Sequence, residues 1–252
     1  MRKRLLVIIP AYNEEKNIGN LLESVLASEV RDKADILVVN DASTDNTAAV
    51  AAGKGVRVLS HTRNRGYGCS LQSGYRYACR HNYQWVIQLD ADGQHDACNL
   101  IDIYNELTTK GADNKYPDIV LCSRFMKGSG RYPISSARKF AYGLFRTMIR
   151  IFSKRTIADP TTGLQGLSRR AFSCYSRPGY FHDKYPDANM VLQMLLLGYK
   201  ITEIPALMHH RRSGSSMHSG LDPVIYMLKM PFAVIAVWMR IKIFKETDGR
   251  LV

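Results

Sequence analysis

The sequence predicts an α/β domain built on a mixed, mostly parallel sheet with helices on both faces. Along the first half of its 252 residues, short runs of apolar residues alternate with amphipathic stretches of helical period. Strands that are apolar throughout are typical of parallel sheets, because neither side of such a strand meets water. A cluster of polar residues follows each of the first four runs. The expected ligand site therefore lies beyond the carboxyl ends of the strands.

Five strands and four helices are expected in this first half. The helix after the second strand is expected to begin at residue 44, because Ser43 or Thr44 can cap the free N–H groups of its first turn. The expected strands cover residues 4–9, 35–39, 56–59, 85–89 and 118–122, and the expected helices cover 14–27, 44–52, 67–81 and 99–109.

The second half of the chain is less regular. Residues 135–154 combine an apolar stripe with a separate basic stripe, as in an amphipathic helix. Residues 189–197 form another expected helix, which Gly198 ends, and residues 201–204 form a short strand. The apolar stretch at 224–244 is interrupted by charges, and no run reaches the roughly 18 uncharged residues of a membrane-spanning helix.

The net charge of +13 favours an anionic partner, which leaves nucleic acid, anionic lipid head groups and phosphorylated substrates open. The five cysteines are scattered and form no CxxC pair, which argues against a disulfide framework or a zinc site. The apolar run after the basic start is too short for the core of a signal peptide. We therefore expect a cytoplasmic protein, with peripheral attachment to the cytoplasmic face of a membrane as an open alternative.

The acidic triplet Asp90-Ala91-Asp92 is the first candidate for chemistry, since it directly follows an expected buried strand. Two carboxylates at one strand end repel each other, and a divalent cation would offset that repulsion. Mg²⁺ and Mn²⁺ prefer oxygen ligands and often join a carboxylate to substrate phosphates. The alternative is a solvated turn, because Asp and Gly are common turn residues.

A second acidic strand end lies at residues 40–45. Asp41 is placed to accept hydrogen bonds from a nucleotide base or a ribose. Asp45 is better explained as a cap of the following helix.

Four short segments in this order, 10–15, 40–45, 64–68 and 90–95, resemble family 2 glycosyltransferases of the GT-A fold. Their sequences are PAYNEE, NDASTD, NRGYG and DADGQH. The likeness continues through 159–164, 198–205, Arg211 and 214–216, so it covers roughly residues 4–216. The chain is most similar to dolichyl- or polyprenyl-phosphate sugar synthases and to bacterial polysaccharide glycosyltransferases. The resemblance implies a GT-A catalytic domain over 1–216 and a helical tail over 217–252.

The resemblance also implies roles for individual residues. The metal would be held by Asp92, with Asp90 and Gln94 beside it at the diphosphate. The donor nucleotide sugar would be bound by Pro10, Tyr12, Glu14, Asp41, Gly68, Asp90 and Arg211.

Asp187 corresponds to the catalytic carboxylate that many family members place eleven residues before the glycine matching Gly198. The lipid-phosphate synthases instead have Gln at this position and an acid at the position of Asn189. That departure weakens the assignment to their branch and leaves Asp187 suited to deprotonate a sugar hydroxyl. The alternative is that Asp187 caps the following helix.

The resemblance implies an inverting, metal-dependent transfer from a GDP- or UDP-linked sugar to a lipid-linked glycan or polyprenyl phosphate. Mg²⁺ or Mn²⁺ would be the cofactor, and no nucleic acid is expected as partner. The open alternatives are a sugar nucleotidyltransferase and a catalytically silent nucleotide-sugar-binding protein. The first would usually carry a Gly-rich phosphate loop after the first strand, where this chain has Ala-Tyr-Asn-Glu-Glu. Residues 135–154 and 224–244 are expected either to lie on an anionic membrane surface or to pack on the domain.

Overall fold

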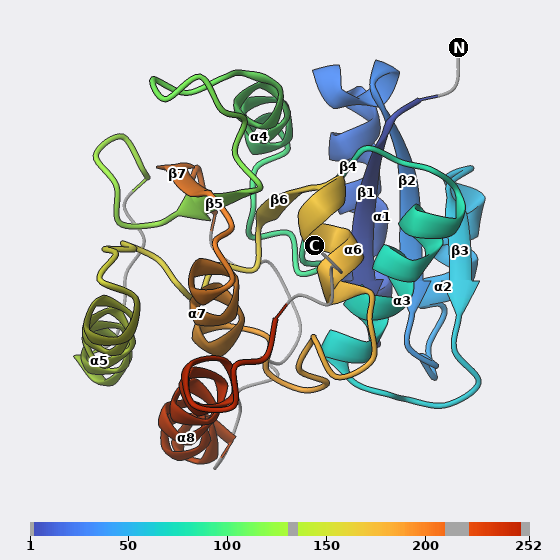
Figure 1. Ribbon diagram of the computed structural model, residues 1–252. Coiled ribbons are helices and arrows are strands. Elements are labelled where there is room, and N and C mark those ends of the chain that lie inside the picture. The colour runs from blue at the N-terminus through green and yellow to red at the C-terminus, as the bar shows by residue number, and fades with distance from the viewer. Residues whose placement is uncertain (1–2, 131–135, 210–221, 248–252) are drawn as a thin grey trace.

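The computed structural model describes residues 3–130, 136–209 and 222–247. In the second range the side chains are described from residue 139 onward, and in the third range from residue 226 onward. Its centre is a seven-stranded sheet with helices on both faces (Figure 1). The strands are β1 (Leu5–Ala11), β2 (Ala34–Asn40), β3 (Arg57–Ser60), β4 (Trp85–Gln88), β5 (Ile119–Ser123), β6 (Gln165–Ser168) and β7 (Ile201–Pro205).

The helices follow the predicted alternation closely in the first half of the chain. They are α1 (Glu15–Ala27), α2 (Thr47–Gly53), α3 (Tyr67–Arg80), α4 (Cys98–Thr108), α5 (Ser136–Ser153), α6 (Arg169–Tyr175), α7 (Ala188–Leu196) and α8 (Asp222–Lys242), with a short 3₁₀ turn at Glu29–Asp32.

The sheet order is β3-β2-β1-β4-β6-β5-β7, and the mixed, mostly parallel sheet is confirmed. Strands β1 to β4 pair in parallel, and β5 pairs in parallel with β7. Strand β6 lies between β4 and β5 and runs antiparallel to both. The carboxyl ends of β1, β2 and β4 therefore meet at one edge, where the polar clusters were expected.

Strand β6 and helix α6 were not predicted. The strand has only four residues, of which three are Gln, Gly and Ser, so it lacks the apolar run that marked the other strands. Gly166 is required there, because a Cβ atom would lie 2.2 Å from Cγ2 of Ile103 on α4. Ser168 ends the strand and caps α6 by accepting the N–H of Ala171 at 3.3 Å.

The predicted start of the second helix was wrong. Helix α2 begins at Thr47, and neither Ser43 nor Thr44 caps it. Both residues instead bond to Asn13 at the end of β1. The Ser43 hydroxyl accepts the N–H of Asn13 at 3.0 Å, and the side-chain oxygen of Asn13 accepts the N–H of Thr44 at 2.8 Å. Ser43 and Thr44 therefore connect the loops after β1 and β2 and do not cap α2.

The core has two parts, one on each face of the sheet. Alternate residues of β1 divide between them, so that Leu6 and Ile8 share a core with α3, α6 and α7, whereas Leu5 and Val7 share one with α1 and α4. This alternation is the geometry of a strand buried on both sides.

Helix α8 completes the first of these cores, which confirms the predicted helical tail. Its inward side chains are fully or almost fully buried, and they pack with α7 and α5. They are Met230, Val234, Val237 and Ile241. Figure 1 shows α5, α7 and α8 together below the β5 and β7 end of the sheet.

Candidate active site

The ends of β1 and β2 are locked together by side chains that bond to backbone N–H groups. Asp45 accepts the N–H of Thr47, which begins α2, at 3.0 Å and the N–H of Glu15, which begins α1, at 3.1 Å. Asp45 was expected to cap the following helix; it does bond to the first residue of α2, although Asn46 occupies the N-cap position, and it also bonds to the first residue of α1. Ala42 has a φ of 58°, a left-handed conformation that is rare for alanine. The hydrogen bonds of the residues that follow it, Ser43 to Asp45, stabilise this conformation.

Asp41 is a buried hub for the loop between β3 and α3. Its carboxylate accepts the N–H groups of Arg65 at 2.9 Å and of Gly66 at 2.7 Å, and it lies 2.7 Å from Nδ1 of His61. His61 in turn contacts the hydroxyl of Ser73 on α3 at 2.9 Å. These bonds shape the expected donor site, and direct contact between Asp41 and the donor stays a prediction. His61 had been expected only as part of the polar cluster after the third strand, with no role of its own.

Asp90 is held from two sides at the end of β4. The Tyr67 hydroxyl donates a hydrogen bond of 2.7 Å to its Oδ1. On the other side, Gly163 lies so close that an added Cβ would be 2.1 Å from Oδ2 of Asp90. The Asp159–Gly163 loop and α3 thus fix one carboxylate of the acidic triplet. Neither Tyr67 nor Gly163 was predicted to support it.

The neighbouring His95 is neutral at neutral pH. Burial lowers its pKa to about 4, although the charge of Asp92 opposes that shift. Its Nε2 lies 4.0 Å from Oδ2 of Asp90, so the ring adds no positive charge to this carboxylate.

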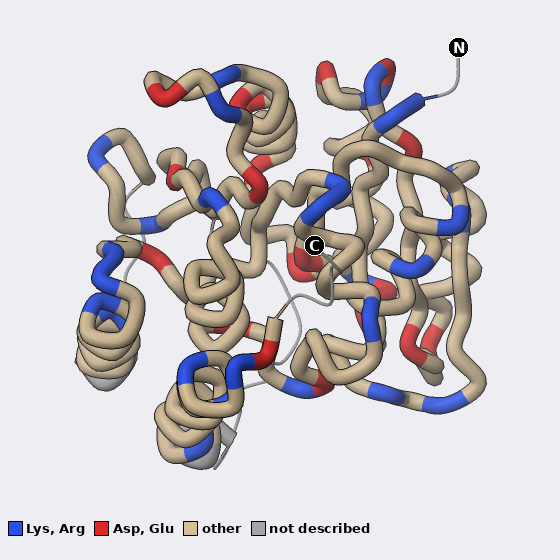
Figure 2. Tube along the Cα trace, viewed as in Figure 1, with Lys and Arg blue, Asp and Glu red and all other residues tan. Residues whose placement is uncertain are grey.

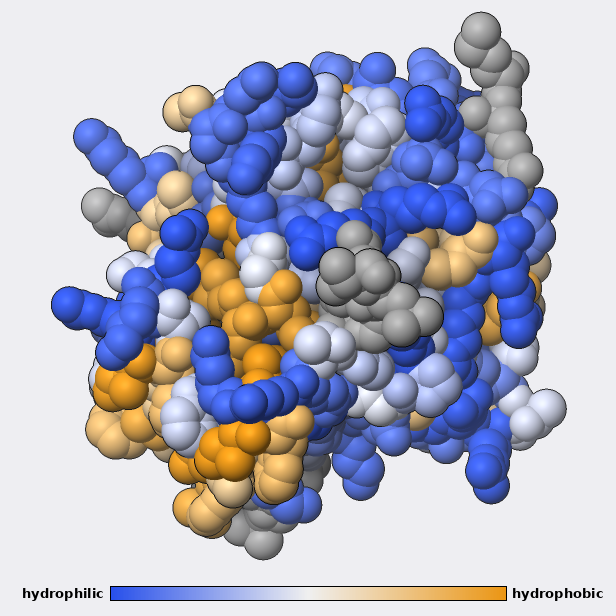
Figure 3. All heavy atoms as spheres, viewed as in Figure 1, coloured by the Kyte–Doolittle hydropathy of each residue, from blue (hydrophilic) through white to orange (hydrophobic). Residues whose placement is uncertain are grey.

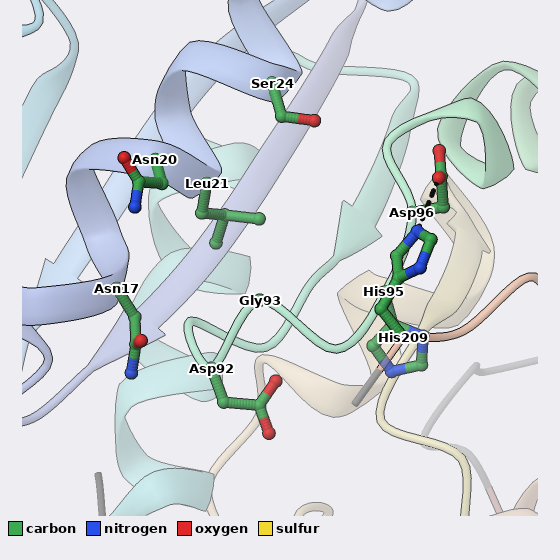
Figure 4. A pocket seen from close by; sticks show the side chains of 9 residues that line it. All are labelled: Asn17, Asn20, Leu21, Ser24, Asp92, Gly93, His95, Asp96 and His209. Atoms are coloured by element: carbon green, nitrogen blue, oxygen red, sulfur yellow. Dashed lines mark hydrogen bonds and ion pairs between the residues drawn. The ribbon is translucent and has the colours of Figure 1, made fainter. Parts of the chain in front are cut away.

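Asp92 lines a polar pocket of about 170 Å³ between α1 and the loop after β4 (Figure 4). Its Oδ1 accepts the N–H of Gln94 at 3.0 Å, which bends the loop back on itself. The backbone oxygen of Gln94 accepts the N–H of His209 at 2.7 Å, and the His209 ring lies 2.7 Å from Asp96. The loop of the predicted metal ligands is therefore tied to the strand end that precedes residues 210–221.

The residues of the acidic triplet fit a metal that is shared with a substrate. Among the described residues, no group of three or more His, Cys, Asp or Glu side chains is placed to hold a metal by itself. Mg²⁺ is usually bound by one or two carboxylates together with substrate phosphates, and Asp90 and Asp92 offer that kind of ligand set. Their role as metal ligands stays a prediction.

Asp187 occupies the N-cap position directly before α7, yet its side chain accepts no hydrogen bond from the helix. The carboxylate itself therefore does not cap α7. Its carboxylate accepts a hydrogen bond from the Tyr226 hydroxyl on α8. Burial raises the pKa of Asp187 to about 6, and the charge of Asp90 adds to the rise, whereas Tyr226 and Arg124 oppose it. The predicted catalytic carboxylate and the acidic triplet thus lie in one electrostatic environment.

Arg124 and Asp159 form a buried ion pair beside this environment. Nε and Nη2 of Arg124 each donate a hydrogen bond of 2.7 Å to one carboxylate oxygen of Asp159, which is completely buried. Burial opposes the charge of Arg124, but the hydrogen bonds and charge of Asp159 outweigh it and raise the arginine pKa. The family likeness had included residues 159–164, but it gave no indication of the arginine that anchors them.

The remaining predicted donor residues are spread along the same edge. Pro10 is buried at the end of β1, and Tyr12 is 45% exposed beyond it. Glu14 precedes α1 and accepts the side-chain N–H of Asn17 at 2.6 Å. Gly68 has a packing reason of its own, since an added Cβ would lie 2.0 Å from the backbone oxygen of His182. Arg211 lies outside the described residues.

Known proteins share both the sequence pattern and the fold. A model of glycosyl transferase family 2 matches residues 6–176. An uncharacterised protein of Methanocaldococcus jannaschii is 34% identical over 209 residues, 81% of each chain. The undecaprenyl-phosphate mannosyltransferase of Micrococcus luteus is 27% identical over 86% of this chain and 88% of its own.

Among solved structures, glucosyl-3-phosphoglycerate synthase from Mycobacterium tuberculosis, in complex with Mn²⁺, UDP and glucosyl-3-phosphoglycerate, superposes with a TM-score of 0.65. The match covers 94% of this chain and 79% of the other at 20% identity, so it speaks for the fold alone. The family model covers more than half of the sequence and includes the ends of β1, β2 and β4. The chain therefore belongs to glycosyl transferase family 2.

Proposed function

We propose that the protein transfers a sugar, with inversion, from a GDP- or UDP-linked donor to an acceptor oxygen on a lipid-linked glycan or a polyprenyl phosphate. The observation that carries the proposal is the Asp187 carboxylate, which caps no helix and is influenced by the charge of Asp90. The names of two relatives support a polyprenyl-linked acceptor. They are the undecaprenyl-phosphate mannosyltransferase of Micrococcus luteus and the polyprenol monophosphomannose synthase of Mycolicibacterium smegmatis, which is 26% identical over 86% of this chain.

Asp187 acts in this proposal as the general base for a hydroxyl acceptor. The carboxylate takes the hydroxyl proton while the acceptor oxygen bonds to the anomeric carbon from the face opposite the diphosphate. The bond from that carbon to the diphosphate oxygen breaks, and its electron pair leaves with the nucleoside diphosphate. A pKa near 6 leaves Asp187 mostly ionised at neutral pH and still basic enough to accept the proton.

Asp90, Asp92 and Gln94 are the residues proposed to hold Mg²⁺ or Mn²⁺ at the donor diphosphate. When bound, the ion supplies positive charge that stabilises the leaving diphosphate. The chain's own contribution is to fix the position of these ligands. Tyr67 and Gly163 do so for Asp90, and the N–H of Gln94 does so for Asp92.

Asp187→Asn tests the base. The amide keeps the shape of the side chain but cannot take a proton, so we expect kcat to fall about 10²-fold or more with little change in donor KM. Asp183→Asn, an exposed carboxylate in the same loop, is the matched control and should retain activity. A phosphate acceptor is already anionic and needs no base. Near-normal turnover by Asp187→Asn would therefore refute the general-base role.

The same assay separates the competing functions. A panel of sugar nucleotides is incubated with the wild type and a polyprenyl-phosphate or glycan acceptor, and release of nucleoside diphosphate is measured. Release of a nucleoside diphosphate with a glycosylated product supports transfer. In a parallel incubation with a sugar phosphate and a nucleoside triphosphate, formation of a sugar nucleotide would indicate a nucleotidyltransferase instead. Donor binding without turnover across the panel would indicate a silent binding protein.

An anionic membrane surface is the proposed second partner. Helices α5 and α8 expose large apolar side chains on their outer faces, and Figure 3 shows apolar surface over this part of the molecule with hydrophilic residues around it. The most exposed of these side chains on the helices are Phe140, Ile151, Leu228 and Phe232, and Ile243 and Phe244 follow directly after α8. Figure 2 shows basic residues along both helices. Exposed lysines lie on or directly after the helices: Lys139, Lys154, Lys229, Lys242 and Lys245.

Apolar side chains bordered by lysines are typical of helices that lie in the head-group region, where each nearby Lys or Arg adds roughly 1 kcal/mol on anionic lipid. Within the described ranges, none of the helices is both long enough and apolar enough to cross a bilayer.

A further inference from the structure

Arg146 has a guanidinium group that its surroundings do not satisfy. It lies on α5 with its Cζ 4.1 Å from the centre of the Phe125 ring. Two of its nitrogens, Nε and Nη2, are buried, and neither has a hydrogen-bond partner among the described residues. Arginine keeps its charge at every physiological pH, so these donors remain charged where water is excluded. Buried charges are normally paired because an unpaired one is costly.

Arg124 shows what a satisfied arginine looks like at the same ring. Its Cζ lies 5.6 Å from the Phe125 ring centre, and both oxygens of Asp159 accept its hydrogen bonds. Thr161 accepts a further one at 2.8 Å. Phe125 therefore contacts two guanidinium groups, but the ion pairs on the described residues include a carboxylate for only one of them. The second guanidinium lacks an anion.

The site of that missing anion is connected to the proposed reaction centre through Phe125 and Arg124. The charge of Arg124 lowers the pKa of Asp187, so Arg124 is within electrostatic reach of the base, and Arg146 contacts the same phenyl ring as Arg124. Helix α5, which carries Arg146, packs on α7, and Asp187 stands at the start of α7. The polar pocket beside α1 is lined by Asp92 and does not include Arg146. An anion at Arg146 would therefore be distinct from one bound in that pocket.

We propose that Arg146 binds a phosphate group of the acceptor, with Nε and Nη2 donating to two of its oxygens. The planar fork of a guanidinium matches two oxygens of one phosphate. Phe125 holds the guanidinium plane by stacking, and the saturated Arg124 adds positive charge nearby without supplying donors of its own. Assigning the phosphate to the acceptor rests on the proposed function. The phosphate can belong to a lipid or to a small soluble ester, and Arg146 recognises the chemistry that the two share.

The test measures phosphate binding by the whole chain, and the rise in the Tm of thermal unfolding is the readout. The probes are inorganic phosphate, glycerol phosphate and geranyl phosphate at constant ionic strength. EDTA is present so that a metal-bridged diphosphate site does not contribute. We expect each probe to raise the Tm of the wild type in a saturable way. Arg146→Met keeps much of the stacking volume but removes the fork, and it should weaken binding at least tenfold.

Arg150→Met is the matched control, because Arg150 is exposed one turn further along α5. It should bind all three probes like the wild type. Arg146→Lys keeps the charge without the fork and should fall between wild type and Arg146→Met. Since phosphate relieves the unpaired charge, Arg146→Met without ligand should be at least as stable as the ligand-free wild type. That last comparison keeps a folding defect from imitating lost binding.

Equal affinity of Arg146→Met and the wild type for phosphate would overturn the proposal. So would a loss in Arg150→Met as large as that in Arg146→Met, because the effect would then be one of general charge. Geranyl phosphate binding tenfold tighter than glycerol phosphate would identify a lipid acceptor, and equal affinities would identify a soluble one. No donor enters this assay, so a negative result leaves sugar transfer untouched, and an inactive enzyme leaves phosphate binding measurable.

Discussion

The chemistry of the site depends on one residue whose charge is finely balanced. Burial and the carboxylate of Asp90 disfavour the ionised form of Asp187, whereas the Tyr226 hydroxyl and the charge of Arg124 favour it. The buried carboxylate of Asp159 adds a smaller unfavourable contribution. The Tyr226 hydroxyl can be removed without loss of the ring. The hydroxyl contacts Asp187, while the ring packs edge-on against Phe145 and Tyr185.

Tyr226→Phe is expected to move the acidic limb of the pH–rate profile to higher pH. The variant keeps the ring but removes a hydrogen bond to the ionised carboxylate, so the pKa of Asp187 rises above its value of about 6. The base works only when ionised, so kcat should fall several-fold at pH 6 and stay near the wild-type value at pH 8.5.

Tyr185→Phe is the control for this profile, since the Tyr185 ring packs edge-on against Tyr226 but Tyr185 is not among the groups that shift the pKa of Asp187. Its acidic limb should match that of the wild type. A uniform loss of kcat in Tyr226→Phe at all pH values would show that the tyrosine only packs, and the tuning role would have to be abandoned.

Gly163→Ala is expected to weaken metal-dependent turnover. The added Cβ would meet Oδ2 of Asp90 at 2.1 Å, so the carboxylate must move away from the end of β4. We expect the Mn²⁺ concentration for half-maximal rate to rise about tenfold, since small displacements of reacting groups have large effects on rate. Asp92→Ala should abolish turnover at every Mn²⁺ concentration. Gly143→Ala, where a Cβ meets nothing within 4 Å, should match the wild type in the same titration.

At the scale of the elements, the sequence predicted those strands and helices that have a local pattern of apolar residues. Strand β1 is apolar throughout and β2 is apolar over residues 36–39, because both faces of these strands are buried, and this gives a signal that needs no knowledge of the fold. Strand β6 has no such signal, since its position depends on α4 approaching its backbone at Gly166. The contact between Tyr226 and Asp187 joins α8 to α7 and has no counterpart in spacing or composition.

Gly166→Ala tests the close approach of α4 to β6. The new Cβ would collide with Ile103, which is completely buried, so the free energy of unfolding should fall by about 1–3 kcal/mol. Urea unfolding measures the loss. Ile103→Ala removes the colliding Cγ2 atom, and in the double variant the combined loss should be smaller than the sum of the single losses. Strict additivity would mean that α4 does not rest on β6 in the way the structure shows.

At the scale of the whole molecule, the inner and outer faces of α8 have different environments. Its inner face completes the core next to α7 and presents Tyr226 to Asp187, whereas its outer face exposes apolar side chains beside those of α5. The sequence had left packing and membrane contact as alternatives for this segment. The structure shows that α8 packs, and the exposed side chains leave the outer face available for a second surface. The proposed reaction centre would then lie directly behind the membrane-facing helices.

Replacing apolar side chains on α8 and directly after it with acidic ones should release the protein from anionic vesicles. Phe232 and Phe244 are both 73% exposed, so Asp at these positions should leave the fold intact while it opposes insertion and repels the head groups. Sedimentation at low salt should bring down the wild type but not Phe232→Asp/Phe244→Asp. Tyr116→Asp, at an exposed aromatic side chain before β5, is the control and should sediment like the wild type. Because apolar insertion resists screening, part of the wild type should stay bound at high salt. A wild type that remains in the supernatant at low salt would rule out the membrane surface as partner.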